Sequence, residues 1–173
     1  MSPYTPDEYA ALLARTYTPR FPRDDRPRIL RDVDDKGQDT LELILPHPED
    51  ACFSVSLTAY SDKGLISSCS LRFGRADVAK SLEPDEALDA IEEILSDRIV
   101  AIVRYKDQEA YENHRKVSTA PTEWLYQMPD HEEALEAMLR ELERPATFLD
   151  KLVGRKVGVF EVYRWSENRL YKR

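Results

Sequence analysis

The stretch CFSVSLTAYSDKGLISSCSLRFG, residues 52–74, alternates apolar and polar side chains on both sides of a short turn. An alternation with a period of two is typical of β-strands that bury one face and leave the other open. The SDKG turn at 61–64 favours a three-residue loop in which Gly64 adopts a left-handed conformation beside a β-bulge. We therefore predict an antiparallel hairpin in which Leu57 lies opposite Cys69.

The two faces of this hairpin differ in chemistry. The face expected to enter the core is apolar apart from one serine and carries Phe53, Val55, Leu57, Ala59, Ser67, Cys69, Leu71 and Phe73. The opposite face is rich in hydroxyl groups and carries Ser54, Ser56, Thr58, Tyr60, Ile66, Ser68, Ser70 and Arg72. Because Cys69 belongs to the first face and Cys52 to the second, we expect two separate thiols, with neither a disulfide nor a shared metal.

The segments upstream of the hairpin extend the same pattern. A second DKG turn at 35–37 separates a mixed strand near 28–34 from an alternating strand over 41–45, so about four consecutive strands form an antiparallel meander. The first helix is predicted over 5–17, where a Thr and a Glu three residues later form a capping box around Pro6. Its expected apolar stripe is Tyr9, Leu12, Leu13 and Thr16.

The second half of the chain alternates strands and helices. RIVAIVRY at 98–105 is apolar enough to be a central strand buried on both faces, and TEWLYQM at 122–128 is a further strand. A helix over 131–143 is expected to be capped by Asp130, and a last strand over 156–165 is followed by a frayed basic end. Short helices are predicted over 106–116 and 146–154. The prediction is an α+β fold, a largely antiparallel β-sheet meander with helices packed mainly on one face.

Length and composition favour a single α+β domain over 1–173. It begins with a helix and an Arg/Pro-rich linker, 1–28, and ends in a basic strand region, 151–173. The amino terminus lacks the pattern of a secretory signal, and no apolar run is long enough to span a bilayer, so we expect a cytoplasmic protein that does not bind membranes. The net charge of −8 argues against nucleic acid as a partner.

The segment LEPDEALDAIEEILSD, 82–97, predicts an amphipathic helix whose exposed side is acidic without one intervening Lys or Arg. Like charges at i,i+4 destabilise an isolated helix by about 0.2–0.5 kcal/mol per pair, so folding alone does not favour this arrangement. Two interpretations stay open, a solubilising face and a docking surface for a basic protein. The residues expected to contact such a partner are Asp85, Asp89, Glu92 and Glu93.

No motif for catalysis, metal binding or a cofactor is present. The three histidines have no ligand spacing, and no nucleophile elbow or phosphate-binding loop occurs, so we predict no metal and no cofactor. The alternative to a protein-binding function is a small-molecule-binding domain or an enzyme that uses the hydroxyl-rich hairpin face. Arg72 is suited to hold a carboxylate or phosphate there, with Ser54, Ser56, Ser68 and Ser70 around it.

Three segments together resemble small bacterial immunity proteins, the antidotes of polymorphic and contact-dependent toxin systems. They are ISSCSLRFG at 66–74, PDEALDAIEEIL at 84–95 and DRIVAIVRY at 97–105, which cover a strand, a helix and a strand. The resemblance implies an acidic α+β domain that binds and blocks a toxin domain. Because such families vary in binding surface, no functional residue is carried over by position. The acidic helix at 82–97 makes a basic protein the expected partner, and we expect the chain to act by binding it and not by catalysis. Separately, we expect the chain to be a monomer or weak dimer.

Overall fold

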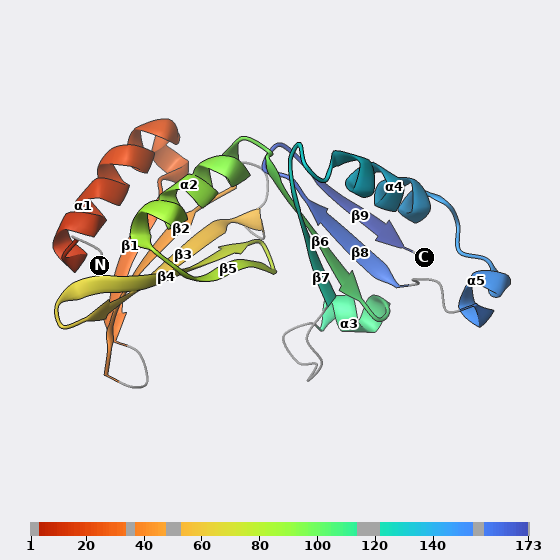
Figure 1. Ribbon diagram of the computed structural model, residues 1–173, viewed down its shortest axis with the longest axis horizontal. Coiled ribbons are helices and arrows are strands. Elements are labelled where there is room, and N and C mark those ends of the chain that lie inside the picture. The colour runs from red at the N-terminus through yellow and green to blue at the C-terminus, as the bar shows by residue number, and fades with distance from the viewer. Residues whose placement is uncertain (1–3, 34–36, 48–52, 114–121, 154–157, 173) are drawn as a thin grey trace. The chain divides into compact units, whose positions relative to one another are not determined.

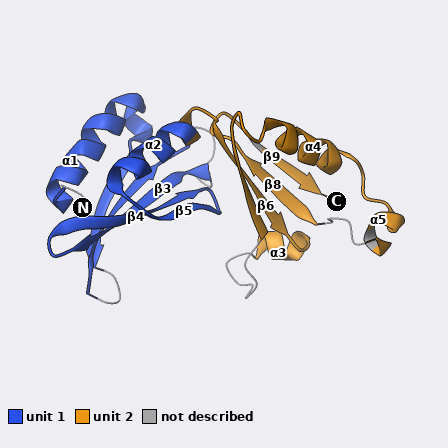
Figure 2. Cartoon of the chain, in the orientation of Figure 1, with its two compact units in different colours: residues 1–93 blue, residues 94–173 orange. Residues whose placement is uncertain are grey.

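The computed structural model describes residues 4–33, 37–47, 53–113, 122–153 and 158–172 (Figure 1). The chain divides into two compact units, residues 1–93 and 94–173, and each unit contains its own antiparallel sheet (Figure 2). The α+β class and the antiparallel sheet pairing are confirmed. That the whole chain is one cooperative domain stays a prediction.

Unit 1 is a meander of five strands in the order β1-β2-β3-β4-β5. Helices α1 and α2 lie on one face of this sheet (Figure 1). The fifth strand is one more than the sequence patterns indicated, and two single 3-10 turns follow α1. The elements are α1 Pro6–Tyr17, η1 Thr18–Arg20, η2 Arg23–Asp25, β1 Arg28–Val33, β2 Asp39–Leu45, β3 Val55–Asp62, β4 Leu65–Phe73, β5 Ala76–Leu82 and α2 Pro84–Leu95.

The register of the β3–β4 hairpin differs from the prediction by two residues. Cys69 lies opposite Ala59 instead of Leu57. The turn consists of Lys63 and Gly64 alone, both with positive φ (52° and 79°), as a two-residue hairpin loop requires. The irregularity falls between Tyr60 and Ser61 instead of at the turn. Because a shift of two residues keeps a side chain on its own face, the apolar side chains predicted to be buried are buried. The prediction is wrong at Ile66, which is buried, and at Ser67, which is exposed, because the irregularity changes the parity at these two positions.

Helix α1 joins β4 and α2 through its buried tyrosine. The predicted capping box is present, with the Thr5 hydroxyl accepting from the Glu8 amide and the Glu8 carboxylate accepting from the Thr5 amide. The Tyr9 hydroxyl donates to the Pro84 carbonyl at 3.0 Å and lies 3.9 Å from Cys69 Sγ. The residues that α1 buries are Tyr9, Leu13 and Tyr17, whereas the predicted Leu12 and Thr16 are half-buried.

Cys69 is a fully buried, free thiol, and Cys52 lies outside the described residues. Burial raises the pKa of the Cys69 thiol to about 11. The expectation that this side chain faces the core is therefore confirmed.

Unit 2 is a four-stranded sheet in the order β7-β6-β8-β9, with the predicted central strand β6 buried along Ile99–Val103. Helix α4 covers one sheet face and forms a core of Val100, Ile102, Leu135, Met138, Leu142, Phe160 and Val162. The elements are β6 Ile99–Tyr105, α3 Gln108–Glu112, β7 Thr122–Gln127, α4 Glu132–Glu143, α5 Phe148–Leu152, β8 Val159–Tyr163 and β9 Asn168–Lys172.

Two predictions for unit 2 are wrong. The basic carboxyl end is not frayed over 168–172, because β9 pairs with β8 along its length after a turn in which the Arg164 amide donates to the Glu167 carbonyl. Asp130 does not cap α4; His131 occupies that position and makes no capping hydrogen bond through its side chain. The amides of His131 and Leu135 bond instead to backbone carbonyls, of Gln127 and His131 respectively.

Candidate functional site

The acidic face of α2, defined by Asp85, Glu86, Asp89, Glu92 and Glu93, lies opposite a buried apolar stripe. The stripe consists of Ala87, Ile91 and Ile94, all with no exposed surface. Asp85, Glu86 and Asp89 are exposed, whereas Glu92 and Glu93 are half-buried. The structure therefore brings the four residues predicted for partner binding onto one helix, as the spacing required.

Two of these carboxylates already have a contact from the amino-terminal segment. The Arg20 guanidinium, in η1, forms an ion pair with Glu92 and lies 5.6 Å from the centre of the Tyr17 ring. The Tyr4 hydroxyl donates to Asp85 at 3.0 Å, and this hydrogen bond raises the pKa of Tyr4. The Arg/Pro-rich linker thus contributes a cation to the acidic face of α2, which the sequence analysis did not foresee.

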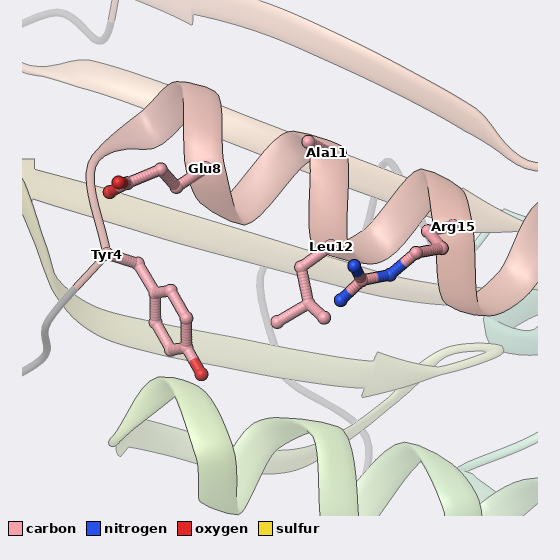
Figure 3. Close-up of a pocket in the computed structure, with 5 residues that line it drawn as sticks. All are labelled: Tyr4, Glu8, Ala11, Leu12 and Arg15. Atoms are coloured by element: carbon pink, nitrogen blue, oxygen red, sulfur yellow. The ribbon is translucent and has the colours of Figure 1, made fainter.

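A hollow of about 550 Å³ lies along α1, on the side that faces α2 (Figure 3). It is lined by Tyr4, Glu8, Ala11, Leu12 and Arg15. Tyr4, which precedes α1, and Leu12, within α1, both point towards α2. Glu8 is committed to the capping box, but Arg15 makes no hydrogen bond or ion pair with any residue that the structure describes. The acidic face of α2 is thus bordered by apolar surface and one unpaired cation.

The hydroxyl-rich face of the hairpin is also assembled, though with a different pairing. Ser56 lies opposite Arg72, Ser70 opposite Thr58 and Ser68 opposite Tyr60, while Ser54 lies just before β3. Apart from the exposed Arg72, these side chains are half-buried.

Arg72 is already engaged by a carboxylate. Its Nε lies 3.1 Å from Asp77 Oδ1, and Lys80 Nζ lies 2.9 Å from the other oxygen of Asp77. Asp77 belongs to β5, the strand that the sequence analysis missed. A carboxylate or phosphate ligand would therefore have to compete with Asp77 for the guanidinium.

A buried carboxylate in unit 2 was not anticipated. Glu161 is 2% exposed and accepts hydrogen bonds from the hydroxyls of Tyr105 at 2.8 Å and Tyr163 at 2.5 Å. These donors offset part of the cost of removing the carboxylate from water. In the sequence, the cluster is marked only by one Glu inside an apolar strand. Because the carboxylate is buried and both its contacts are with tyrosines of the same sheet, we assign the cluster a structural role.

Within the described ranges, no three His, Cys, Asp or Glu side chains are grouped closely enough to hold a metal ion. Across the same residues, no helix combines the length and apolar character needed to cross a membrane. Comparison with protein-family models, with curated proteins and with solved structures finds no match to this chain.

Proposed function

We propose that this protein is a non-enzymatic protein-binding domain, a stoichiometric inhibitor of the immunity type that neutralises a basic toxin or effector. The acidic face of α2 is its contact surface. The observation that carries the proposal is the contrast between α2 and α4. Both are twelve-residue helices that bury an apolar stripe, but α4 places Arg140 four residues after Glu136, whereas 83–97 contains no Lys or Arg. Packing alone therefore does not account for the charge on α2.

The distribution of charge between the units supports the same partner chemistry. Residues 1–93 carry 11 basic and 19 acidic side chains, whereas residues 94–173 carry 14 of each. The whole net charge of −8 thus belongs to the unit that presents α2. A field of one sign accelerates the encounter with a partner of the opposite sign and disfavours partners of the same sign.

The hollow beside α2 supplies the apolar contact that charge alone lacks. Stable interfaces combine a desolvated apolar centre with a charged rim. The Tyr4 ring, which contacts Asp85 through its hydroxyl, and the Leu12 side chain both point towards α2 and provide such a centre. On the hydroxyl-rich face, by contrast, Asp77 already occupies Arg72, so that face is the weaker candidate.

Matched charge reversals test the proposal. The double variant Asp85→Lys, Asp89→Lys changes α2, and Glu132→Lys, Glu136→Lys makes the same charge change at exposed i,i+4 positions of α4. The tagged protein first captures its partner from a lysate of the source cells, and association of the purified pair is then measured at low and high salt. We expect the α2 variant to slow association by about tenfold or more, with little effect of the α4 variant.

The inhibitory role has its own readout. Expression of the captured partner alone should arrest growth, and co-expression of the wild-type chain should restore it in proportion to the amount of chain. Equal rescue by the α2 and α4 variants, with association rates that do not depend on salt, would show that α2 is only a solubilising face. A captured partner that is acidic and harmless would remove the proposal as a whole.

A further inference from the structure

Helix α5 exposes nearly all of its apolar surface. Phe148 is 76% exposed, Leu149 68%, Leu152 66% and Val153 69%. Among the residues that the structure describes, the other exposed large apolar side chains lie on three different strands and are only 40–55% exposed; they are Leu30, Val33, Leu125 and Leu170. Isolated apolar side chains on a surface are ordinary, but four within six residues form a patch. We call these four residues the α5 patch.

Polar contacts hold α5 in place. Asp150 is 3% exposed, and its Oδ2 accepts from the amide and the hydroxyl of Thr147 at 2.8 and 2.9 Å. Its Oδ1 accepts from Arg144 at 3.1 Å, and its amide donates back to Thr147 Oγ1 at 3.3 Å. The helix therefore turns its carboxylate inward and its apolar side chains outward, the reverse of an ordinary surface helix. This leaves the α5 patch available for an external contact.

The size of the patch matches a contact with a second copy. Its four side chains expose on the order of 500 Å², close to the largest patch found on typical monomers. In a symmetric pair the same patch is buried on both copies, so the total reaches roughly 1,000 Å², the lower bound for a specific interface. The interface would therefore be small and weak.

The charge distribution also favours a second copy at this position. Arg144 neutralises Asp150, and residues 94–173 carry equal numbers of acidic and basic side chains. Two copies that meet through α5 therefore join units with no net charge. A contact through residues 1–93 would instead bring together two units that each carry a net charge of −8, and their repulsion would cost energy.

We propose that the protein forms a weak symmetric homodimer in which the α5 patch of one copy packs against the α5 patch of the other. The proposal does not depend on the function assigned to α2. From the buried area and the cost of association, the dissociation constant is on the order of 100 µM.

Sedimentation velocity of the full chain, from about 1 µM to about 1 mM, measures this equilibrium directly. The variants Leu149→Lys and Leu149→Glu place a charge in the α5 patch, and each should weaken self-association by at least tenfold because like charges then face each other. An equimolar mixture of the two should associate at least as tightly as the wild type, because opposite charges then meet. The control pair, Leu125→Lys and Leu125→Glu on β7, should self-associate like the wild type, alone or mixed.

The variant Phe148→Ser gives the same information without a new charge and should also weaken the dimer. Circular dichroism verifies the fold of every variant, which we expect to be retained because the substituted side chains are exposed. A wild-type chain that stays monomeric up to about 1 mM would overturn the proposal. So would a Lys/Glu mixture that remains monomeric. A monomeric chain that sediments with vesicles of phosphatidylcholine and phosphatidylserine would assign the α5 patch to a membrane and likewise overturn the proposal.

Discussion

Substitution of Gly158 by Ala should destabilise unit 2 strongly, because the chain approaches the end of β6 closely at this position. A Cβ placed on Gly158 would lie 2.2 Å from the Tyr105 carbonyl oxygen and 3.1 Å from that of Lys106. Both contacts are with backbone atoms, which cannot rotate away as a side chain does. The φ of Gly158 is +131°, a conformation that L-residues rarely adopt.

The expected cost is the sum of a conformational and a steric contribution. A positive φ at a non-glycine residue costs about 1–3 kcal/mol, and overpacking adds about 1–3 kcal/mol, so the free energy of unfolding should fall by roughly 2–6 kcal/mol. Gly64→Ala is the matched control, since its φ is also positive (+79°) and nothing lies within 4 Å of its Cβ. This variant should lose only about 1–2 kcal/mol.

Urea denaturation is the appropriate assay, followed by tryptophan fluorescence for Gly158→Ala and by far-UV circular dichroism, which follows both units, for Gly64→Ala. Both tryptophans of the chain, Trp124 and Trp165, belong to residues 94–173, so their fluorescence reports on unit 2. If Gly158→Ala costs no more than Gly64→Ala, the close approach to Tyr105 is absent in solution and the reasoning is wrong.

Two further predictions concern cooperativity and the buried thiol. Tryptophan fluorescence follows unit 2, and far-UV circular dichroism follows both units. If the whole chain is one cooperative domain, the two signals should give the same urea midpoint for the wild type. Separate midpoints would show that the units unfold independently. In a Cys52→Ser background, native Cys69 should react with a thiol reagent only as the pH nears 11, whereas the urea-unfolded thiol should react from about pH 9. Because the folded pKa is the higher one, Cys69 contributes its full stability below pH 9 and loses about 3 kcal/mol as the pH rises through 11, a decline that Cys69→Ala should lack.

The hairpin shows how far the sequence alone predicts this fold. Period-two alternation assigned residues 55–60 of β3 and 68–73 of β4 to the correct face, because burial of one face depends only on the parity of the position. It assigned Ile66 and Ser67 to the wrong faces, because the irregularity between Tyr60 and Ser61 changes the parity there. The register depends on the turn, and Lys63-Gly64 is compatible with both a two-residue and a three-residue loop. The structure selects the two-residue loop and compensates with an irregularity between Tyr60 and Ser61, which no local pattern indicates.

The missed strands have a common physical cause. β5 and β9 are edge strands, and their sequences, ADVAKSL and NRLYK, lack a clean apolar alternation. Such strands form because a neighbour offers unpaired backbone groups, and that information lies outside the segment itself.

The same limit applies to the candidate site. The acidic face of α2 is readable from helical spacing, because all of its members lie within one helix. The contacts that it receives are not readable, since 72 residues separate Arg20 from Glu92 and 81 separate Tyr4 from Asp85. The inward turn of Asp150 in α5 is likewise set by Arg144 and Thr147 and not by helical periodicity.

The two proposed surfaces differ in their response to salt, which allows them to be tested in one protein. Attraction between the acidic face of α2 and a basic partner is screened, since the Debye length falls from about 30 Å at 0.01 M to about 8 Å at 0.15 M ionic strength. Burial of the α5 patch is not screened, and sulfate strengthens it because the ion is excluded from protein surfaces. Added sodium sulfate should therefore slow association with the basic partner and tighten the homodimer. If sulfate weakens both reactions together, the self-association is electrostatic, and burial of Phe148, Leu149, Leu152 and Val153 does not drive it.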